Sequence, residues 1–406
     1  MSPPTQADIA REVVQTIANG QATSVFARFA PELLQEYTAV QLLQAWREQT
    51  DELGRLIAIG DPEQKLVSGT EALVVPVIHR KGIHRVTVVF EDESSISGLW
   101  LSDISSEQDT DQTATCPSYV DQSAFDERSV SVPGEGKDLP GTLAVPRGTE
   151  SPPGVVLVHG SGPADRDGRV GSRYPLRDIG LGLASHGIAT LRYDKRTFVE
   201  QLQPRETTIE RVVVDDAVSA LDRLRAEGVS PCGVVGHSLG GMLAPRIASE
   251  DGNTDAICCL AANARPLSEL VLSQIGALVP DDGQTRTLSP IRDTFERAQN
   301  GSMRPDEQLF GAPVTFWKSL RGYDACEAAA ALSVPMLFVQ GREDRQVRAD
   351  VEFEQWRAAL GDRRNVTFSL YEGLDHLLTP ASDRETTQVS EAVLEETADW
   401  LLGCDP

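Results

Sequence analysis

Several features are scarce or missing in this sequence of 406 residues. Lysine is scarce, because only five of the 37 basic residues are lysines. No apolar run approaches the roughly 18 residues that a membrane-spanning helix needs. The N-terminus, MSPPTQADIAREVVQ, has neither the basic start nor the long apolar stretch of a secretory signal. We therefore expect a cytoplasmic protein that does not bind membranes.

Cysteine is also sparse, and its spacing carries no signature. The six cysteines show no Cys-x-x-Cys pair and no dense framework; they are Cys116, Cys232, Cys258, Cys259, Cys326 and Cys404. A disulfide-stapled secreted domain would need closer and more regular spacing. The pattern predicts mostly buried thiols in a reducing compartment.

Acidic residues, by contrast, are abundant, and the formal net charge is −24. Such a charge argues against nucleic acid and anionic membranes as partners, since both repel it. Excess carboxylate with scarce lysine suggests a halophilic protein from a high-salt cytoplasm. A GC-rich genome that favours arginine codons is the alternative explanation. The sequence leaves the oligomeric state open.

The chain divides by pattern into three segments. In segment 1–104, helix-like stretches are followed by Val- and Ile-rich strands, which predicts a small α+β domain. Segment 105–123 begins with the polar, aperiodic SSEQDTDQTATC and is the candidate linker. Segment 124–406 alternates strands with helices, which predicts βαβ units and a mostly parallel sheet. A helical insertion at about 265–330 is expected to form a cap.

The stretch PCGVVGHSLGGMLAP places one serine between glycines where a buried strand should meet a helix. Gly-x-Ser-x-Gly at such a junction is the nucleophile elbow of α/β-hydrolases. The turn strains the serine backbone and lifts its hydroxyl above the sheet edge. Side chains two residues away would collide, so Gly236 and Gly240 suit their places. Ser238 is therefore the candidate nucleophile.

A serine hydroxyl needs a base to take its proton, and histidine is the usual one. Of the six histidines only His376 follows Ser238, in a loop after the last predicted strand. The acid should lie between the two residues, past the preceding strand, which selects Asp344. Glu343 is the nearest rival, and Asp375 adjoins the histidine but should point elsewhere.

The developing oxyanion needs two preorganised N–H donors. We expect one from the amide of Leu239, at the start of the helix, and one from Ser161 in the loop His159-Gly160-Ser161-Gly162. A phosphate cradle is the rival interpretation of this loop, but it lacks the Gly-Lys-Ser/Thr that should follow. His159 precedes the serine in the chain and is interpreted as a brace of the loop.

The combined motifs resemble bacterial and archaeal α/β-hydrolases of the serine esterase type. They are HGSGPADRDG, LRYDKR, GHSLGGMLAP, QGREDRQV and EGLDH, and the resemblance covers about 124–402. It implies an α/β-hydrolase fold and a Ser238–Asp344–His376 triad that needs no cofactor. It also implies, less specifically, an N-terminal domain of the nuclear-transport-factor-like, cystatin-like shape. Relatives often carry an aromatic residue where this chain has Arg345.

Two charged clusters match the same family, Asp165-Arg166-Asp167 and Asp194-Lys195-Arg196. We interpret them as ion pairs that hold the oxyanion loop. A divalent metal at Asp165 and Asp167 is the alternative.

The predicted function is hydrolysis of carboxylic esters, with a small acyl compound as substrate, through an acyl-serine intermediate. A thioesterase, a peptidase or an acyltransferase would use the same triad. A non-catalytic binding scaffold on the same fold is the alternative of a different class.

Overall fold

The structure is a computed structural model that describes residues 4–31, 33, 38–67, 70–101, 115–279, 281–382 and 387–404. The chain forms two compact units. The first unit comprises Met1–Thr110 and Val271–Val314, and the second comprises Asp111–Leu270 and Thr315–Pro406. Most of the predicted linker 105–123 lies outside the described residues. No described helix is long and apolar enough to cross a bilayer.

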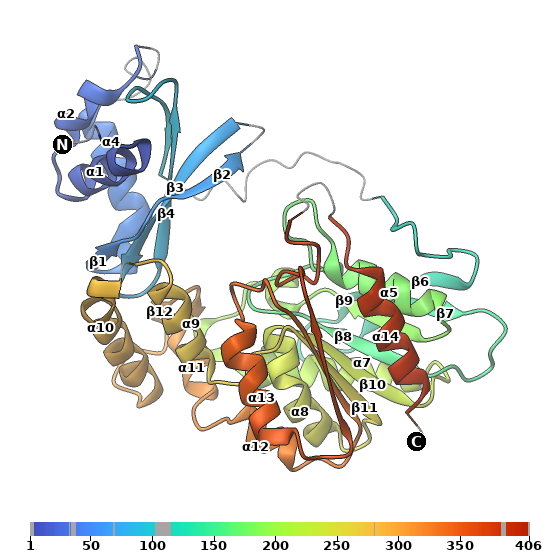
Figure 1. Ribbon diagram of the computed structural model, residues 1–406. Helices are drawn as coiled ribbons and strands as arrows, with labels where there is room; N and C mark the ends of the chain where they lie inside the picture. Colours follow the sequence, from blue (N-terminus) through green and yellow to red (C-terminus); the bar gives the residue numbers. More distant parts are fainter. Residues whose placement is uncertain are drawn as a thin grey trace. The chain divides into compact units, whose positions relative to one another are not determined.

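The first unit opens with helices that pack on an antiparallel sheet (Figure 1). Thr5 caps the first helix, which buries Ile9, Val13, Val14 and Ile17 on one face, as the periodicity predicts. The helices are α1 (Gln6–Ala18), α2 (Ala22–Val25), η1 (Phe26–Arg28), α4 (Ala39–Thr50) and η2 (Asp51–Leu53).

The sheet of the first unit runs in the order β1-β3-β4-β5, and β2 pairs with β3 off this path. The strands are β1 (Leu56–Ile59), β2 (Glu63–Val67), β3 (Thr70–His79), β4 (Ile83–Phe90) and β5 (Ile96–Trp100). The sequence pattern did not predict β2, because four of its five residues are exposed and it lacks the apolar alternation of its neighbours. A small antiparallel α+β domain is thus present, as predicted.

Part of the predicted insertion belongs to the first unit. This part, Val271–Val314, contains most of α9 (Leu267–Gly276), then α10 (Asp281–Gln299), β12 (Gln308–Leu309) and β13 (Ala312–Pro313). The backbone amide of Asp61 donates to the carbonyl of Leu278 at 3.0 Å. Lys81 Nζ lies 2.8 Å from Glu307 Oε2, and Arg80 Nε donates to Thr294 Oγ1 at 2.8 Å. The compact units therefore divide the predicted insertion, and its middle packs with the N-terminal segment.

The second unit is built on an eight-stranded sheet in the order β15-β14-β11-β10-β8-β9-β7-β6. The pairs from β15 to β9 are parallel, and β7 and β6 add an antiparallel edge. The strands are β6 (Phe125–Val132), β7 (Leu139–Pro146), β8 (Gly154–Val158), β9 (Ala189–Tyr193), β10 (Cys232–His237), β11 (Ala256–Leu260), β14 (Met336–Gly341) and β15 (Val366–Tyr371). The predicted mostly parallel sheet is confirmed.

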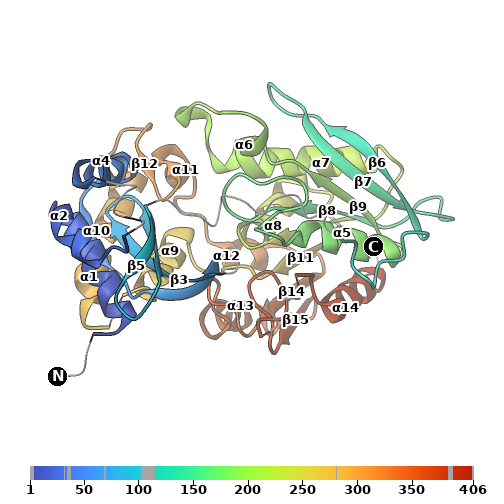
Figure 2. The same ribbon diagram turned by 90° about the horizontal axis from the view of Figure 1, so that it is seen from above.

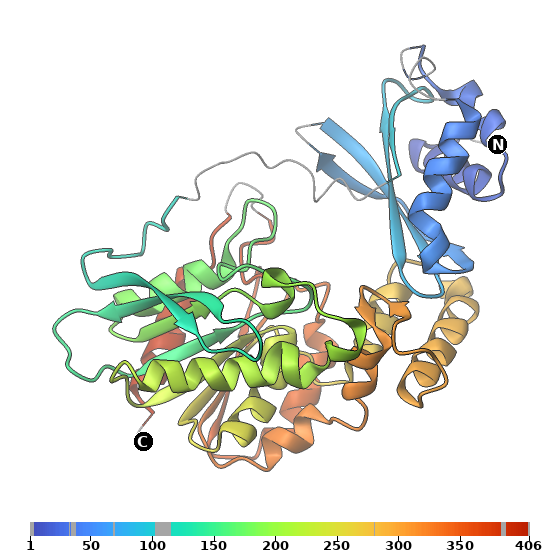
Figure 3. The ribbon, with the colours of Figure 1, turned by 180° about the vertical axis from the view of Figure 1, so that it is seen from behind.

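Helices cover both faces of this sheet (Figures 1 and 2). One face carries α5 (Pro175–Ser185) and α14 (Glu391–Leu402). The other carries α7 (Asp215–Arg225), α8 (Leu239–Asp251), α12 (Ala325–Ala330) and α13 (Glu354–Leu360), with α7 in front in Figure 3. Shorter turns complete the unit: α6 (Arg196–Val199), η4 (Pro204–Glu206), η5 (Glu210–Val214), α11 (Val314–Ser319) and η6 (Ala349–Phe353).

This topology fixes where a site can form. The central strands β8 and β10 are buried at every residue, as strands covered on both faces must be. The carboxyl ends of parallel strands meet at one edge of the sheet, where ligands bind in open α/β folds. The loops after β8, β10 and β14, and the loop after β15, therefore all start from the same edge.

Candidate active site

Ser238 occupies a strained turn between β10 and α8. Its backbone has φ 55° and ψ −117°, a conformation that costs a non-glycine residue about 1–3 kcal/mol. A Cβ on Gly236 would lie 2.3 Å from the carbonyl oxygen of Gly240, and one on Gly240 would lie 2.4 Å from that of Val158. Both positions therefore require glycine, and the strand, turn and helix are those predicted.

Asp344 and His376 meet at this edge of the sheet. His376 Nδ1 lies 2.8 Å from Asp344 Oδ2, although 32 residues separate the two in the chain. The Asp344 side chain is fully buried, and that of His376 is 10% exposed. An ionised carboxylate only accepts hydrogen bonds, so the neutral imidazole that fits this contact has its proton on Nδ1 and a lone pair on Nε2.

The Asp344 carboxylate is held by further donors. Its Oδ1 accepts the backbone amides of Gln346 and Val347, each at 2.8 Å. Its Oδ2 accepts Gln340 Nε2 at 2.9 Å as well as the histidine. Four donors fix the carboxylate in one orientation and satisfy its buried charge.

The two rival carboxylates lie elsewhere. Glu343 is exposed. Asp375 Oδ2 lies 2.6 Å from Arg173 Nη1, and its Oδ1 accepts the backbone amide and the hydroxyl of Thr379. Asp375 thus shapes the loop that presents His376 while pointing away from the imidazole, as expected from the sequence.

His237 links the serine turn to the histidine loop. Its Nε2 donates to the carbonyl oxygen of His376 at 2.8 Å, and the two ring centroids are 4.9 Å apart. Burial, and then the charge of His376, lowers the pKa of His237 to about 4. His237 is therefore neutral near pH 7, and its one N–H is committed to this bond.

The predicted oxyanion loop passes over the serine. A Cβ on Gly160 would lie 3.3 Å from the Cβ of Ser238, a tight contact that a larger side chain would have to relieve by small shifts. Lys195 Nζ donates to the carbonyl oxygen of Gly160 at 2.7 Å. Leu239 begins α8 directly after the serine and is buried. Leu239 thus follows Ser238 directly in the chain, and Gly160, the residue before Ser161, lies beside the serine.

Comparison with known proteins identifies the family. The model of the Alpha/beta hydrolase family matches residues 155–389, more than half of the chain. The chain belongs to the α/β-hydrolase family. Among its relatives, Esterase EstD of Thermotoga maritima is 36% identical over 323 residues, which cover 78% of this chain and 76% of that protein.

Solved structures with lower sequence identity align with part of this chain. Est1E from Butyrivibrio proteoclasticus is 17% identical, covers 68% of this α/β-hydrolase and 97% of its own chain, and has a TM-score of 0.46. An esterase from Pyrobaculum calidifontis is 18% identical, with coverages of 69% and 87% and a TM-score of 0.45.

Buried groups brace the oxyanion loop of this α/β-hydrolase. His159 Nε2 lies 3.1 Å from the Asp165 carbonyl, and its ring packs edge-on against Tyr193 with centroids 5.2 Å apart. Burial, and then the charge of Lys195, lowers the pKa of His159 to about 3. Arg166 binds Asp194 with Nε and Nη2, each at 2.8 Å. His159 is thus a neutral brace, as interpreted.

The charged clusters are used within the protein, though not only in ion pairs. Asp165 Oδ1 accepts the amides of Asp167 and Arg169, both at 3.1 Å, and Asp167 forms an ion pair with Arg192. The two carboxylates proposed as an alternative metal site therefore already have protein partners. In the part of the chain that the structure describes, no group of three or more potential ligands could hold a metal ion.

The sequence pattern did not single out Gln340, which stands in a buried apolar strand, or His237, which occupies the variable position of the serine motif. Lys195 was expected to help hold the oxyanion loop through ion pairs, but it binds a backbone carbonyl of that loop instead. A buried polar residue at a strand's carboxyl end was the available signal for Gln340. The partners of the other two come from distant loops, which no local pattern reveals.

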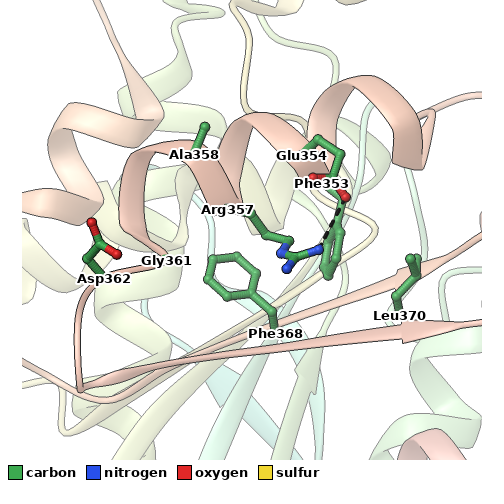
Figure 4. A pocket seen from close by; sticks show the side chains of 8 residues that line it. All are labelled: Phe353, Glu354, Arg357, Ala358, Gly361, Asp362, Phe368 and Leu370. Carbon is green, nitrogen blue, oxygen red and sulfur yellow. Dashed lines mark hydrogen bonds and ion pairs between the residues drawn. The ribbon is translucent and has the colours of Figure 1, made fainter.

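A concavity away from the triad lies between α13 and β15, the last strand at one end of the sheet (Figure 4). It is lined by Phe353, Glu354, Arg357, Ala358, Gly361, Asp362, Phe368 and Leu370. Within it Arg357 Nη1 lies 3.4 Å from Glu354 Oε1. None of the residues around Ser238 lines this hollow.

Proposed function

We propose that this α/β-hydrolase hydrolyses carboxylic esters with Ser238 as nucleophile, His376 as base and Asp344 as the residue that orients the base. The reaction class is the one predicted, and the family and the esterase relative confirm it. The roles of the three residues are our inference. The observation that carries them is the 2.8 Å bond from His376 to the buried Asp344, beside the strained turn at Ser238.

In the first step the Ser238 hydroxyl gives its proton to His376 Nε2 while its oxygen attacks the ester carbonyl carbon. The carbonyl π electrons move onto the oxygen, and a tetrahedral oxyanion forms. Asp344 holds Nδ1–H, keeps Nε2 free to accept, and stabilises the imidazolium. The amides of Leu239 and Ser161 are placed to donate to the oxyanion.

The oxyanion then collapses, the bond to the alcohol oxygen breaks, and His376 returns the proton to that oxygen. The acyl group remains on Ser238. Water repeats the sequence: it gives a proton to His376, attacks the acyl carbon, and releases the carboxylic acid as Ser238 regains its proton. No bond-making step in this scheme calls on a cofactor.

The finer expectations about the whole chain are proposals as well. Helices packed on one face of an antiparallel sheet in the first unit support a nuclear-transport-factor-like domain. Six free cysteines support a reducing, cytoplasmic location. The charge of −24 supports small-molecule rather than nucleic-acid partners, and adaptation to high salt. A thermal midpoint that stays flat between 0.1 M and molar KCl would exclude the salt adaptation.

The triad is tested with Ser238→Ala, His376→Ala and the double variant. Alanine fits the turn, so the fold should persist while kcat on an activated ester falls by about 10⁴–10⁶. The double variant should be little worse than either single one, because the residues act as a unit. A fluorophosphonate probe should label wild type and fail on Ser238→Ala. Labelling that persists in Ser238→Ala would place the nucleophile elsewhere.

A further inference from the structure

A buried lysine lies behind the oxyanion loop. Lys195 follows β9 and is only 4% exposed, in a chain with five lysines. Its Nζ donates to the Gly160 carbonyl oxygen at 2.7 Å, and its backbone amide donates to the Ala164 carbonyl at 3.0 Å. Within the described residues no carboxylate lies within ion-pairing distance of this ammonium. Burying a cation whose only partners are neutral carbonyls costs folding free energy. Lys195 is therefore expected to have a role that compensates for this cost.

The nearby carboxylates are committed to other cations. Asp194 binds Arg166 through both of its oxygens. Asp216 binds the buried Arg196, whose Nε lies 3.1 Å from Asp216 Oδ2. Arginines thus take the acidic partners, and the lysine is left to bind the carbonyl of the loop.

The peptide group between Gly160 and Ser161 connects this lysine to the site. In a trans peptide the C=O and the following N–H point in opposite directions. Because Lys195 holds the Gly160 oxygen, the Ser161 N–H points to the opposite side of the peptide. The same loop lies so close to the serine that a Cβ on Gly160 would sit 3.3 Å from Ser238 Cβ.

We propose that Lys195 is a positioning residue for the oxyanion site, which orients and polarises the Gly160–Ser161 peptide so that the Ser161 N–H donates to the oxyanion. A charged donor on the carbonyl oxygen draws electron density from the peptide and makes its N–H a stronger donor. A compact ammonium can do this at a single oxygen, whereas a guanidinium fork needs more room and more acceptors. This inference rests on the proposed function.

The ionisation state of Lys195 gives a specific signature. Burial lowers its pKa to about 8, while the charge of Asp216 acts in the opposite direction. The other titratable groups that face it are Asp194 and His159, which is neutral with a pKa lowered to about 3. The ammonium is thus the form present below about pH 8, and the neutral amine, a weaker donor, replaces it above.

The test uses the full chain with Lys195→Met, which keeps the length of the side chain and removes the donor. Lys137→Met is the matched control, since the exposed Lys137 also donates to a backbone carbonyl, that of Val199 at 3.2 Å. Losing one oxyanion donor outright costs about 10²–10³ in kcat, so weakening one should cost about 10–10² with KM nearly unchanged. Lys137→Met should match wild type.

Two further readouts separate polarisation from mere packing. A trifluoromethyl ketone, whose adduct with serine carries an oxyanion, should bind Lys195→Met about 10–10² times more weakly, while a product alcohol binds as before. In wild type kcat should decline as pH rises through about 8, and this decline should vanish in the variant. Normal kcat and normal ketone affinity in folded Lys195→Met would overturn the proposal.

Failure of the proposed function has a different signature, because Ser238→Ala would then keep its turnover whatever Lys195 does. If Lys195→Met does not fold, Lys195→Gln replaces it in the test. Because the glutamine would retain a neutral donor, Lys195→Gln should lower kcat by less than the roughly 10–10² expected for Lys195→Met. Should neither variant fold, the wild-type profile decides: a kcat that stays flat from pH 7 to 10 would overturn the proposal.

Discussion

Buried histidines serve different ends in the two units. In the first unit, His79 Nδ1 bonds the Gly54 carbonyl at 2.9 Å, and His84 packs edge-on against Trp46 with centroids 5.3 Å apart. In the second unit, His159, His237 and His376 each tie one loop at the sheet's carboxyl edge to another group. Residue type and burial are alike in both. The histidines at the ends of the parallel strands brace or form the site, whereas those of the first unit only pack within their own fold.

Among the carboxylates of the second unit, Asp344 should show the largest effect on catalysis. Asp344→Asn should lower kcat by about 10³–10⁴, because an amide misorients the imidazole and cannot stabilise its charge. Glu343→Gln is the matched control and should be nearly silent, since Glu343 is exposed. Asp375→Asn should lose far less than Asp344→Asn. Steady-state rates on one activated ester decide, and near-normal turnover by Asp344→Asn would refute the assignment of the acid.

Lowering the pH should reduce the stability of the second unit, because two of its buried histidines are held neutral. The pKa values of His159 and His237 are lowered to about 3 and about 4, whereas both groups titrate near 6.5 when unfolded. At a pH between the folded and the unfolded pKa, the unfolded chain binds more protons than the folded chain. The two histidines therefore do not reduce the free energy of unfolding above pH 6.5, and they reduce it progressively as the pH drops toward 4. For His237 the loss is at most about 3 kcal/mol.

The measurement is the thermal midpoint of wild type and His237→Gln between pH 7 and 4.5. The variant lacks the titrating ring, so its midpoint should depend less on pH. Identical slopes for the two proteins would mean that His237 is not held neutral.

The smallest effect should come from the first unit. Lys81→Met removes the partly buried pair with Glu307 and should lower the free energy of unfolding by at most about 1 kcal/mol, with kcat unchanged. Lys65→Met, which removes the exposed pair with Glu63, should cost less. Denaturant midpoints and ester turnover check both. A large loss of kcat in Lys81→Met would contradict the claim that the first unit does not contribute to catalysis.

The sequence predicted those parts of the fold whose signals are local. The buried strand at 256–260 and the turn around Ser238 follow from apolar runs and from glycines. Strand β2 was missed because its residues 63–66 are exposed. The grouping of Val271–Val314 with the N-terminal segment depends on long-range contacts, such as that from Asp61 to Leu278.

The site shows the same limit. Ser238, Asp344 and His376 could be named from chain order and strand ends, and the structure brings Asp344 and His376 together. Lys195 and His237 act on backbone carbonyls of loops far away in the chain. A backbone acceptor has no sequence signature, so residues that bind one are found only in three dimensions.

The central claim is that ester hydrolysis passes through an acyl group on Ser238. The most direct measurement mixes full-length protein with an activated ester, quenches within the first turnover, and locates the acyl group by peptide mass spectrometry. The account predicts the acyl mass on the peptide that contains Ser238 in wild type, and none in Ser238→Ala. Acyl on another residue, or undiminished turnover with no acyl-enzyme in either protein, would contradict it.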